Sequence, residues 1–108
     1  MGTSVAVQTL GDGGYTEHLD ADDGFAGQIT LEVYGTFVGT MTFQARIAGG
    51  TNVYTVTATR LADNTAVTTV SNANPGMYRV NATGIEVRLL MTAWTSGAAS
   101  VIVKPLIG

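Results

Sequence analysis

The chain has 108 residues, which is enough for one domain with a single hydrophobic core. Hydrophobic residues make up 45% of it and charged residues only 12%, a balance that argues against intrinsic disorder. The net charge of −3 argues against a nucleic-acid partner, and the absence of cysteine excludes disulfides and zinc–thiolate sites. With one His and four Ser, the composition offers few nucleophiles and bases and favours a protein that is not an enzyme.

Alternation of apolar and polar residues, rather than helical periodicity, dominates the sequence. Seventeen Thr and twelve Val favour strands, because side chains branched at Cβ fit a pleated sheet better than a helix. Residues 28–34 show the clearest alternation, with Ile29, Leu31 and Val33 on one face. Turns rich in Gly, Asn and Pro separate the alternating segments. The seven predicted strands span residues 28–34, 40–47, 53–59, 65–70, 77–82, 85–91 and 99–106.

Each of these strands has a face that we expect to point into the core. Between the first two strands, we expect Phe37 and Val38 to cap the end of the sandwich or to be exposed. Because Pro105 has no N–H to donate, we expect the end of the last strand to lie at a sheet edge. The expected inward residues after the first strand include Met41, Phe43, Ala45, Ile47, Tyr54, Val56, Ala58, Tyr78, Val80, Ile85, Val87, Leu89 and Met91.

The strand spacing predicts an all-β fold, a single antiparallel β-sandwich of jelly-roll or immunoglobulin-like strand order. We assign residues 28–108 to this domain and residues 1–27 to an irregular N-terminal arm, with a short first strand at residues 3–9 as an alternative within it. The start of the chain has no basic region, and no apolar run approaches the ~18 residues of a membrane span. We therefore expect neither a signal peptide nor contact with a membrane.

Charge is distributed unevenly along the chain. The first 32 residues hold six acids and no Lys or Arg, whereas the remaining 76 carry a net charge of +3. One interpretation is a solvated acidic loop. The other is an arm that docks on a neighbouring subunit or on a host surface, with apolar side chains as anchors. The candidate contact residues of this arm are Tyr15, Leu19, Asp20, Asp22, Asp23 and Phe25.

The acidic run 20–23 suggests a Ca²⁺ site, because hard cations are bound by clustered carboxylates. An EF-hand loop that began at Asp20 would need Gly and Glu where the chain has Phe25 and Leu31. We therefore interpret the run as an acidic turn, with an irregular Ca²⁺ site as the alternative. His18 has no set of companion ligands nearby, and no Gly-x-Ser-x-Gly motif is present. We predict no catalytic residues, no metal site and no cofactor.

The single tryptophan, Trp94, lies next to a predicted turn. We favour a packing role for its ring, and a platform on which a sugar stacks is the alternative. In that alternative the glycan contacts are Tyr34, Phe37 and Trp94.

Several segments in fixed order carry a resemblance to a known class of protein. They are residues 33–44 (VYGTFVGTMTFQ), 49–54 (GGTNVY), 75–80 (PGMYRV), 87–89 (VRL) and 95–97 (TSG). Their order resembles that of small β-sandwich domains in the virion proteins of tailed bacteriophages, including head decoration and head-fibre proteins. The resemblance covers about residues 28–104, and many such domains have Trp where this chain has Tyr54.

This resemblance implies a non-enzymatic structural protein of the virion. It would be made in the cytoplasm of the host bacterium and would decorate the outer surface of the phage head, binding the major capsid protein and stabilising the shell. A homo-oligomer, with a trimer favoured, would suit the symmetry axes of a capsid. The alternatives are a carbohydrate-binding module of a tail or fibre, and a structural subunit of the tail or neck.

Overall fold

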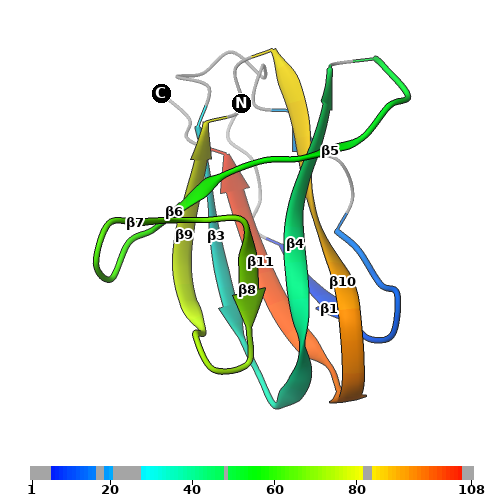
Figure 1. Cartoon of the computed structure of the whole chain (residues 1–108), viewed down its shortest axis with the longest axis vertical. Coiled ribbons are helices and arrows are strands. Elements are labelled where there is room, and N and C mark those ends of the chain that lie inside the picture. The colour runs from blue at the N-terminus through cyan, green and yellow to red at the C-terminus, as the bar shows by residue number, and fades with distance from the viewer. Residues whose placement is uncertain (1–5, 17–18, 21–27, 48, 82–83, 106–108) are drawn as a thin grey trace.

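The computed structural model describes residues 6–16, 19–20, 28–47, 49–81 and 84–105, and every regular element in these ranges is a β-strand (Figure 1). The strands form two antiparallel sheets that pack face to face, so the predicted all-β sandwich is confirmed. Within the same ranges, no helix is long and apolar enough to span a membrane.

The larger sheet has six strands in the order β1-β11-β3-β9-β6-β7. The second sheet has the order β2-β10-β4-β5. β8 also pairs with β4, at residues 40–42, whereas β5 pairs with it at residues 44–45. Consecutive strands β10 and β11 lie in different sheets, which differs from the immunoglobulin order, where the last two strands share a sheet. The larger sheet comprises β1 (Ala6–Leu10), β11 (Ala99–Pro105), β3 (Gln28–Tyr34), β9 (Gly76–Asn81), β6 (Ala58–Arg60) and β7 (Thr65–Val67). The second sheet comprises β2 (Leu19–Asp20), β10 (Ile85–Gly97), β4 (Phe37–Ile47), β5 (Tyr54–Thr55) and β8 (Thr69–Ser71).

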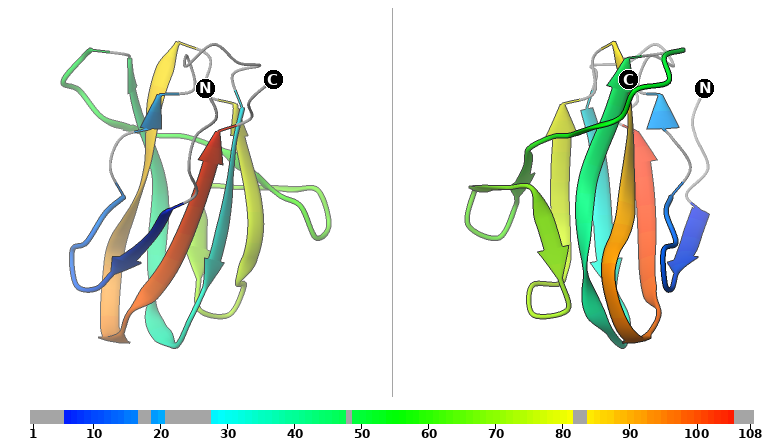
Figure 2. Two further views of the ribbon diagram at one scale, coloured as in Figure 1. Left: turned by 180° about the vertical axis from the view of Figure 1, so that it is seen from behind. Right: turned by 45° about the vertical axis from the view of Figure 1, so that its right-hand side comes forward.

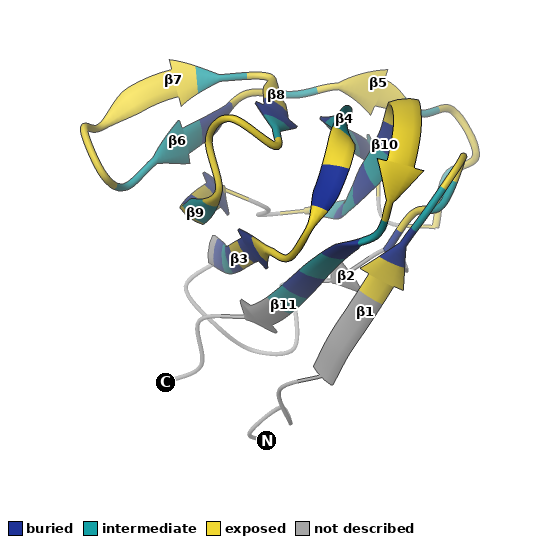
Figure 3. Ribbon diagram, turned by 90° about the horizontal axis from the view of Figure 1, so that it is seen from below, coloured by how far each residue is buried: buried dark blue, intermediate teal, exposed yellow. Residues whose placement is uncertain are grey.

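The core lies between the two sheets, and Figure 3 shows buried segments on both of them. Alternation correctly identified the inward face of β3, whose Ile29, Leu31 and Val33 are fully buried. Phe43 and Tyr78 are the largest buried side chains, and their ring centroids are 5.7 Å apart across the core. The other inward residues that the structure confirms as buried are Met41, Ala45, Ala58, Val80, Val87, Leu89 and Met91.

Two predicted strands are each two strands in the structure. The segment 53–59 divides into β5 and β6, which belong to different sheets, and the segment 65–70 divides into β7 and β8 in the same way. The chain therefore crosses from one sheet to the other and back again, because the hairpin formed by β6 and β7 extends the larger sheet (Figure 1). Period-two alternation continues through such a crossing, so the sequence pattern did not reveal it.

The strands β4 and β10 are longer than predicted and form the longest pairing in the molecule. Their ladder runs from Ile47 opposite Ile85 to Phe37 opposite Gly97, with irregularities near Trp94. The connection between β3 and β4 is consequently only Gly35 and Thr36. Phe37 is buried with 5% of its surface exposed, whereas the neighbouring Val38 is exposed.

The strand that carries Pro105 is not an edge strand, although we expected its end to lie at a sheet edge. β11 lies inside the sheet, between β1 and β3. However, β1 pairs with β11 only as far as Val103, whereas β3 continues to Pro105. Among the described residues, the proline therefore lies beyond the last pair with β1 and has only β3 beside it, where it is opposite Ile29.

Candidate functional site

Residues of the N-terminal region follow the side of β10 that faces away from β4 (Figure 2). The backbone N–H of Met91 donates to the carbonyl of Gly14 (2.8 Å), and the N–H of Thr16 donates to the carbonyl of Leu89 (3.0 Å). The hydroxyl of Thr16, which is fully buried, accepts a bond from the N–H of Leu89 (2.9 Å). Further along, β2 pairs with β10. These bonds satisfy backbone groups that an open strand edge would leave unpaired.

The structure places half of the predicted contact residues along this edge. Tyr15 is 55% exposed, and the guanidinium of Arg88 lies 4.6 Å from the centre of its ring, a cation–π contact. Leu19 and Asp20 form β2, opposite Val87 and Glu86. The other three predicted contacts, Asp22, Asp23 and Phe25, lie outside the described residues, as does His18.

The outer face of β4 and β10 carries polar side chains that pair across the two strands. The Nε of Arg46 donates to Glu86 Oε1 at 2.7 Å, and both side chains are less than one-third exposed. One step along the ladder, the Nε of Arg88 donates to Gln44 Oε1 at 2.9 Å. The polar side chains of these two rungs are therefore already bonded to each other across the strands. Among the described residues, no three His, Cys, Asp or Glu side chains lie close enough to hold a metal ion together.

An apolar end is exposed where β4 ends and β10 begins, uppermost in Figure 1. Ile47 is 69% exposed and Tyr54 is 66% exposed, which corrects the expectation that both point into the core. Ile47 lies two residues after the buried Ala45, and Tyr54 lies directly opposite Ala45 in the ladder, so both are on the inner face of the sheet. They are exposed because no described residue of the facing sheet covers this end.

A shallow pocket of about 260 Å³ opens at this end. Arg46 is the one charged residue in its lining, and the guanidinium of Arg46 is bound to Glu86. The turn that follows β4 is closed by a bond from the N–H of Gly50 to the carbonyl of Ile47 (2.7 Å). The residues lining the pocket are Ala45, Arg46, Ile47, Tyr54, Val56 and Ile85, which we call the apolar end.

Sequence reasoning missed the apolar end as a candidate site. Its residues follow the alternation of core residues, so nothing in their periodicity separates them from the core. The one available signal was Tyr54, the position at which the resembling phage domains often have Trp. Tyr and Trp each join a large apolar ring to a polar group, which suits an exposed contact as well as a core.

The three aromatic residues of the glycan alternative do not form an exposed group. Phe37 is buried, so its ring is not available to a ligand, whereas Tyr34 and Trp94 are each 39% exposed. The indole Nε1 of Trp94 donates to the carbonyl of Gly97 at 2.8 Å, which fixes the ring against its own strand. This bond is consistent with the packing role that we favoured from the sequence.

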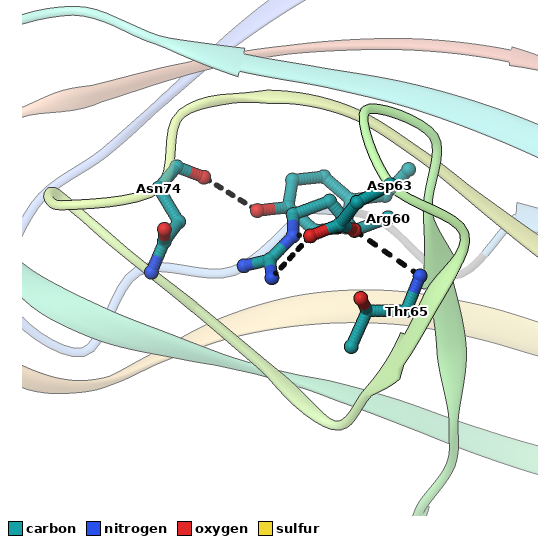
Figure 4. Close-up of polar contacts among 5 residues, drawn as sticks. Arg60, Asp63, Thr65 and Asn74 are labelled. Carbon is teal, nitrogen blue, oxygen red and sulfur yellow. Dashed lines mark hydrogen bonds and ion pairs between the residues drawn. The ribbon is translucent and has the colours of Figure 1, made fainter.

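A polar cluster holds the hairpin of β6 and β7 in place (Figure 4). Both Nε and Nη2 of Arg60 donate to the carboxylate of Asp63, at 3.1 and 3.0 Å, and the N–H of Thr65 also donates to it. These bonds lower the pKa of Asp63 to about 2, mainly through Arg60, and the same pairing raises the pKa of Arg60. The Tyr78 hydroxyl donates to the carbonyl of Asn74, and desolvation raises its pKa. The cluster closes the loops on either side of it.

Comparisons with known proteins support the fold. Scans of the sequence against protein-family models and against curated proteins find no match. Among solved structures, the crystal structure of the SPBc2 prophage-derived protein YomS is similar, with a TM-score of 0.63 and 15% sequence identity. The match covers 94% of this chain and 93% of that one. The chain therefore shares the fold of a prophage-derived protein over nearly its whole length.

Proposed function

We propose that this protein is a non-enzymatic structural component of a tailed-phage particle, and that it decorates the outer surface of the head by binding the major capsid protein. The observation that carries the proposal is the match to a prophage-derived protein over almost the full length of both chains. The resemblance of residues 28–104 to head decoration and head-fibre domains supports the same assignment. Its place of action is then the capsid surface.

The apolar end supplies a docking surface for this role. Exposed apolar side chains that gather at one place typically mark an interaction site. Ile47 and Tyr54 offer an aliphatic and an aromatic side chain beside a pocket large enough for an apolar side chain of the capsid protein. One such contact is weak, but a capsid repeats it many times over its lattice, and the stabilisation of the shell adds up.

The number of copies per particle tests the proposal directly. We expect quantitative mass spectrometry of purified virions to find this chain in hundreds of copies, comparable to the major capsid protein. A handful to a few dozen copies would assign it to the neck, tail or fibres instead. Absence from purified particles would overturn a structural role in the virion.

A pair of matched variants tests the docking surface. The double variant I47S/Y54S should still fold but should no longer bind heads that lack the protein, measured by co-sedimentation. The control is Val38→Ser, which removes an exposed apolar side chain at the opposite end of β4. If I47S/Y54S binds heads as the wild type does, the apolar end is not the docking surface, while the copy number still decides the location.

The carbohydrate-binding alternative depends on the exposed parts of Tyr34 and Trp94, at the end of the sandwich opposite the apolar end. Trp94 is the only tryptophan, so its fluorescence reports directly on a sugar stacked against it. We expect no shift in its emission when host cell-wall glycans are added. A saturable shift would favour the glycan-binding module.

A further inference from the structure

The outer face of the six-stranded sheet carries four side chains that form a quadrangle on β3 and β9. Thr30 lies directly opposite Arg79, and Glu32 lies directly opposite Met77. Neighbouring strands are about 4.8 Å apart and residues two apart on a strand about 6.8 Å. Glu32 and Arg79 therefore occupy one diagonal of the quadrangle, and Met77 and Thr30 occupy the other. The left view of Figure 2 looks onto this face.

The two charged side chains of the quadrangle are exposed and have no partner in the described chain. The ion pairs among the described residues are Arg46–Glu86 and Arg60–Asp63, and neither involves Glu32 or Arg79. These two residues also form no side-chain hydrogen bond within that part of the chain. The other three described arginines each have a partner: Arg46 bonds Glu86, Arg60 bonds Asp63, and Arg88 bonds Gln44 and stacks on Tyr15.

Met77 lies beside these charges and is 53% exposed. The other two described methionines, Met41 and Met91, are buried in the core. Methionine and arginine are both enriched at protein–protein contacts, and the methionine side chain adapts its shape to the surface it meets. The quadrangle thus combines one adaptable apolar side chain with one charge of each sign, neither of which is paired within the described residues.

We propose that this face binds a second copy of the chain through a two-fold axis that lies in the plane of the interface. The axis runs along the diagonal that joins Met77 and Thr30, and it passes midway between Glu32 and Arg79. A two-fold rotation about it brings Glu32 of each copy to Arg79 of the other copy, so that opposite charges face each other. The same axis brings the Met77 side chains of the two copies together. The pattern is self-complementary, and this charge complementarity identifies a second copy as the occupant.

The interface goes beyond the proposed function, because it concerns the free protein and requires no phage particle. Sedimentation velocity of the wild type should show a dimer. The single variants Glu32→Arg and Arg79→Glu should each be monomeric at the same concentration, with a dissociation constant at least about tenfold higher, because each variant places like charges together twice. An equimolar mixture of the two variants should dimerise again, because it restores both opposite-charge contacts.

Asp12→Arg provides the matched control, since it reverses an exposed charge in the loop after β1 and should leave the dimer intact. Met77→Ser should weaken the dimer without changing the far-UV circular dichroism. A monomeric wild type, or an assembly whose size neither charge reversal alters, would overturn the proposal. A mixture that stays monomeric would also overturn it, because a two-fold contact requires the rescue. None of these results changes the copy number per particle, so the two proposals fail independently.

Discussion

Arg46 and Glu86 lie directly opposite each other on β4 and β10, and 2.7 Å separates Nε of the arginine from Oε1 of the glutamate. This ion pair is the first rung of a polar ladder that continues with Gln44 and Arg88 and then with the hydroxyls of Thr42 and Thr92, 3.0 Å apart. The strongly paired outer face of these two strands contrasts with their apolar end. The ladder therefore fixes the register that presents Ile47 beside Ile85.

The first prediction concerns the energy of this ion pair. In a double-mutant cycle, Arg46→Ala, Glu86→Ala and the double variant should give a coupling energy of about 0.5–1 kcal/mol, because the side chains are only partly shielded from water. Urea unfolding of the four proteins measures it. The coupling should fall when the salt concentration is raised, and a coupling that salt does not change would contradict an electrostatic origin.

The second prediction concerns the turn between β10 and β11. Gly97 has a φ of +75°, and a Cβ at this position would collide with the carbonyl oxygen of Thr36 and lie 2.9 Å from the Cα of Phe37. Gly97→Ala should therefore lower the free energy of unfolding by about 3 kcal/mol. Gly13→Ala is the control, since Gly13 has a similar φ of +68° but open space around it. The control should cost about 1 kcal/mol, for the backbone conformation alone.

The third prediction is a pH dependence that arises at Asp63. Its pKa is about 2 in the folded chain against an ordinary 3.8, so the folded state favours the ionised carboxylate. The stabilisation is fully present above the unfolded-state pKa and is lost as the pH falls through the folded-state pKa. The difference in stability between the wild type and Asp63→Asn should be constant above pH about 5 and should shrink towards pH 2. A difference that does not change with pH would exclude this origin.

The fourth prediction contrasts two isoleucines that the sequence places in equivalent positions. Ile29 is fully buried, so Ile29→Ala should lower the free energy of unfolding by about 2–5 kcal/mol. Ile47 is 69% exposed, so Ile47→Ala should change it by less than about 0.5 kcal/mol. Thermal unfolding of both variants measures the contrast. A large loss for Ile47→Ala would mean that the apolar end is covered in solution.

Local alternation predicted most strands because it reports which face of a strand is buried. It gave β3 with its correct bounds and identified the inward residues at the centre of β4 and β10. It failed at Ile47 and Tyr54, which lie on the inward face but are exposed, with no described residue of the facing sheet covering them. Whether a face is covered depends on where the opposite sheet ends, and that information is absent from the residues of the strand itself.

Local sequence patterns also could not predict which distant segments pair with each other. The crossing between β5 and β6 preserves the alternation, so the segment looked like one strand. The ion pair of Arg46 and Glu86 depends on the register of two strands about 40 residues apart. Of the predicted contact residues, Tyr15 is recognisable as a candidate from its aromatic side chain, but its contact with Arg88 follows from the path of the chain along β10. The contact role of the N-terminal residues stays a prediction.

The position of β11 has a consequence for the order in which the molecule folds. This strand comes last among the described elements, yet it lies between β1 and β3, two of the first. The pairs that β11 forms with β1 and β3 therefore cannot form while residues 99–105 are still in the ribosome. Until then, β9 is the only described strand that β3 can pair with. Pairing over such long sequence separations is slow, because a large loop must close before any contact forms. A nascent chain of this protein should accordingly gain protection from proteolysis only after its synthesis has passed β11.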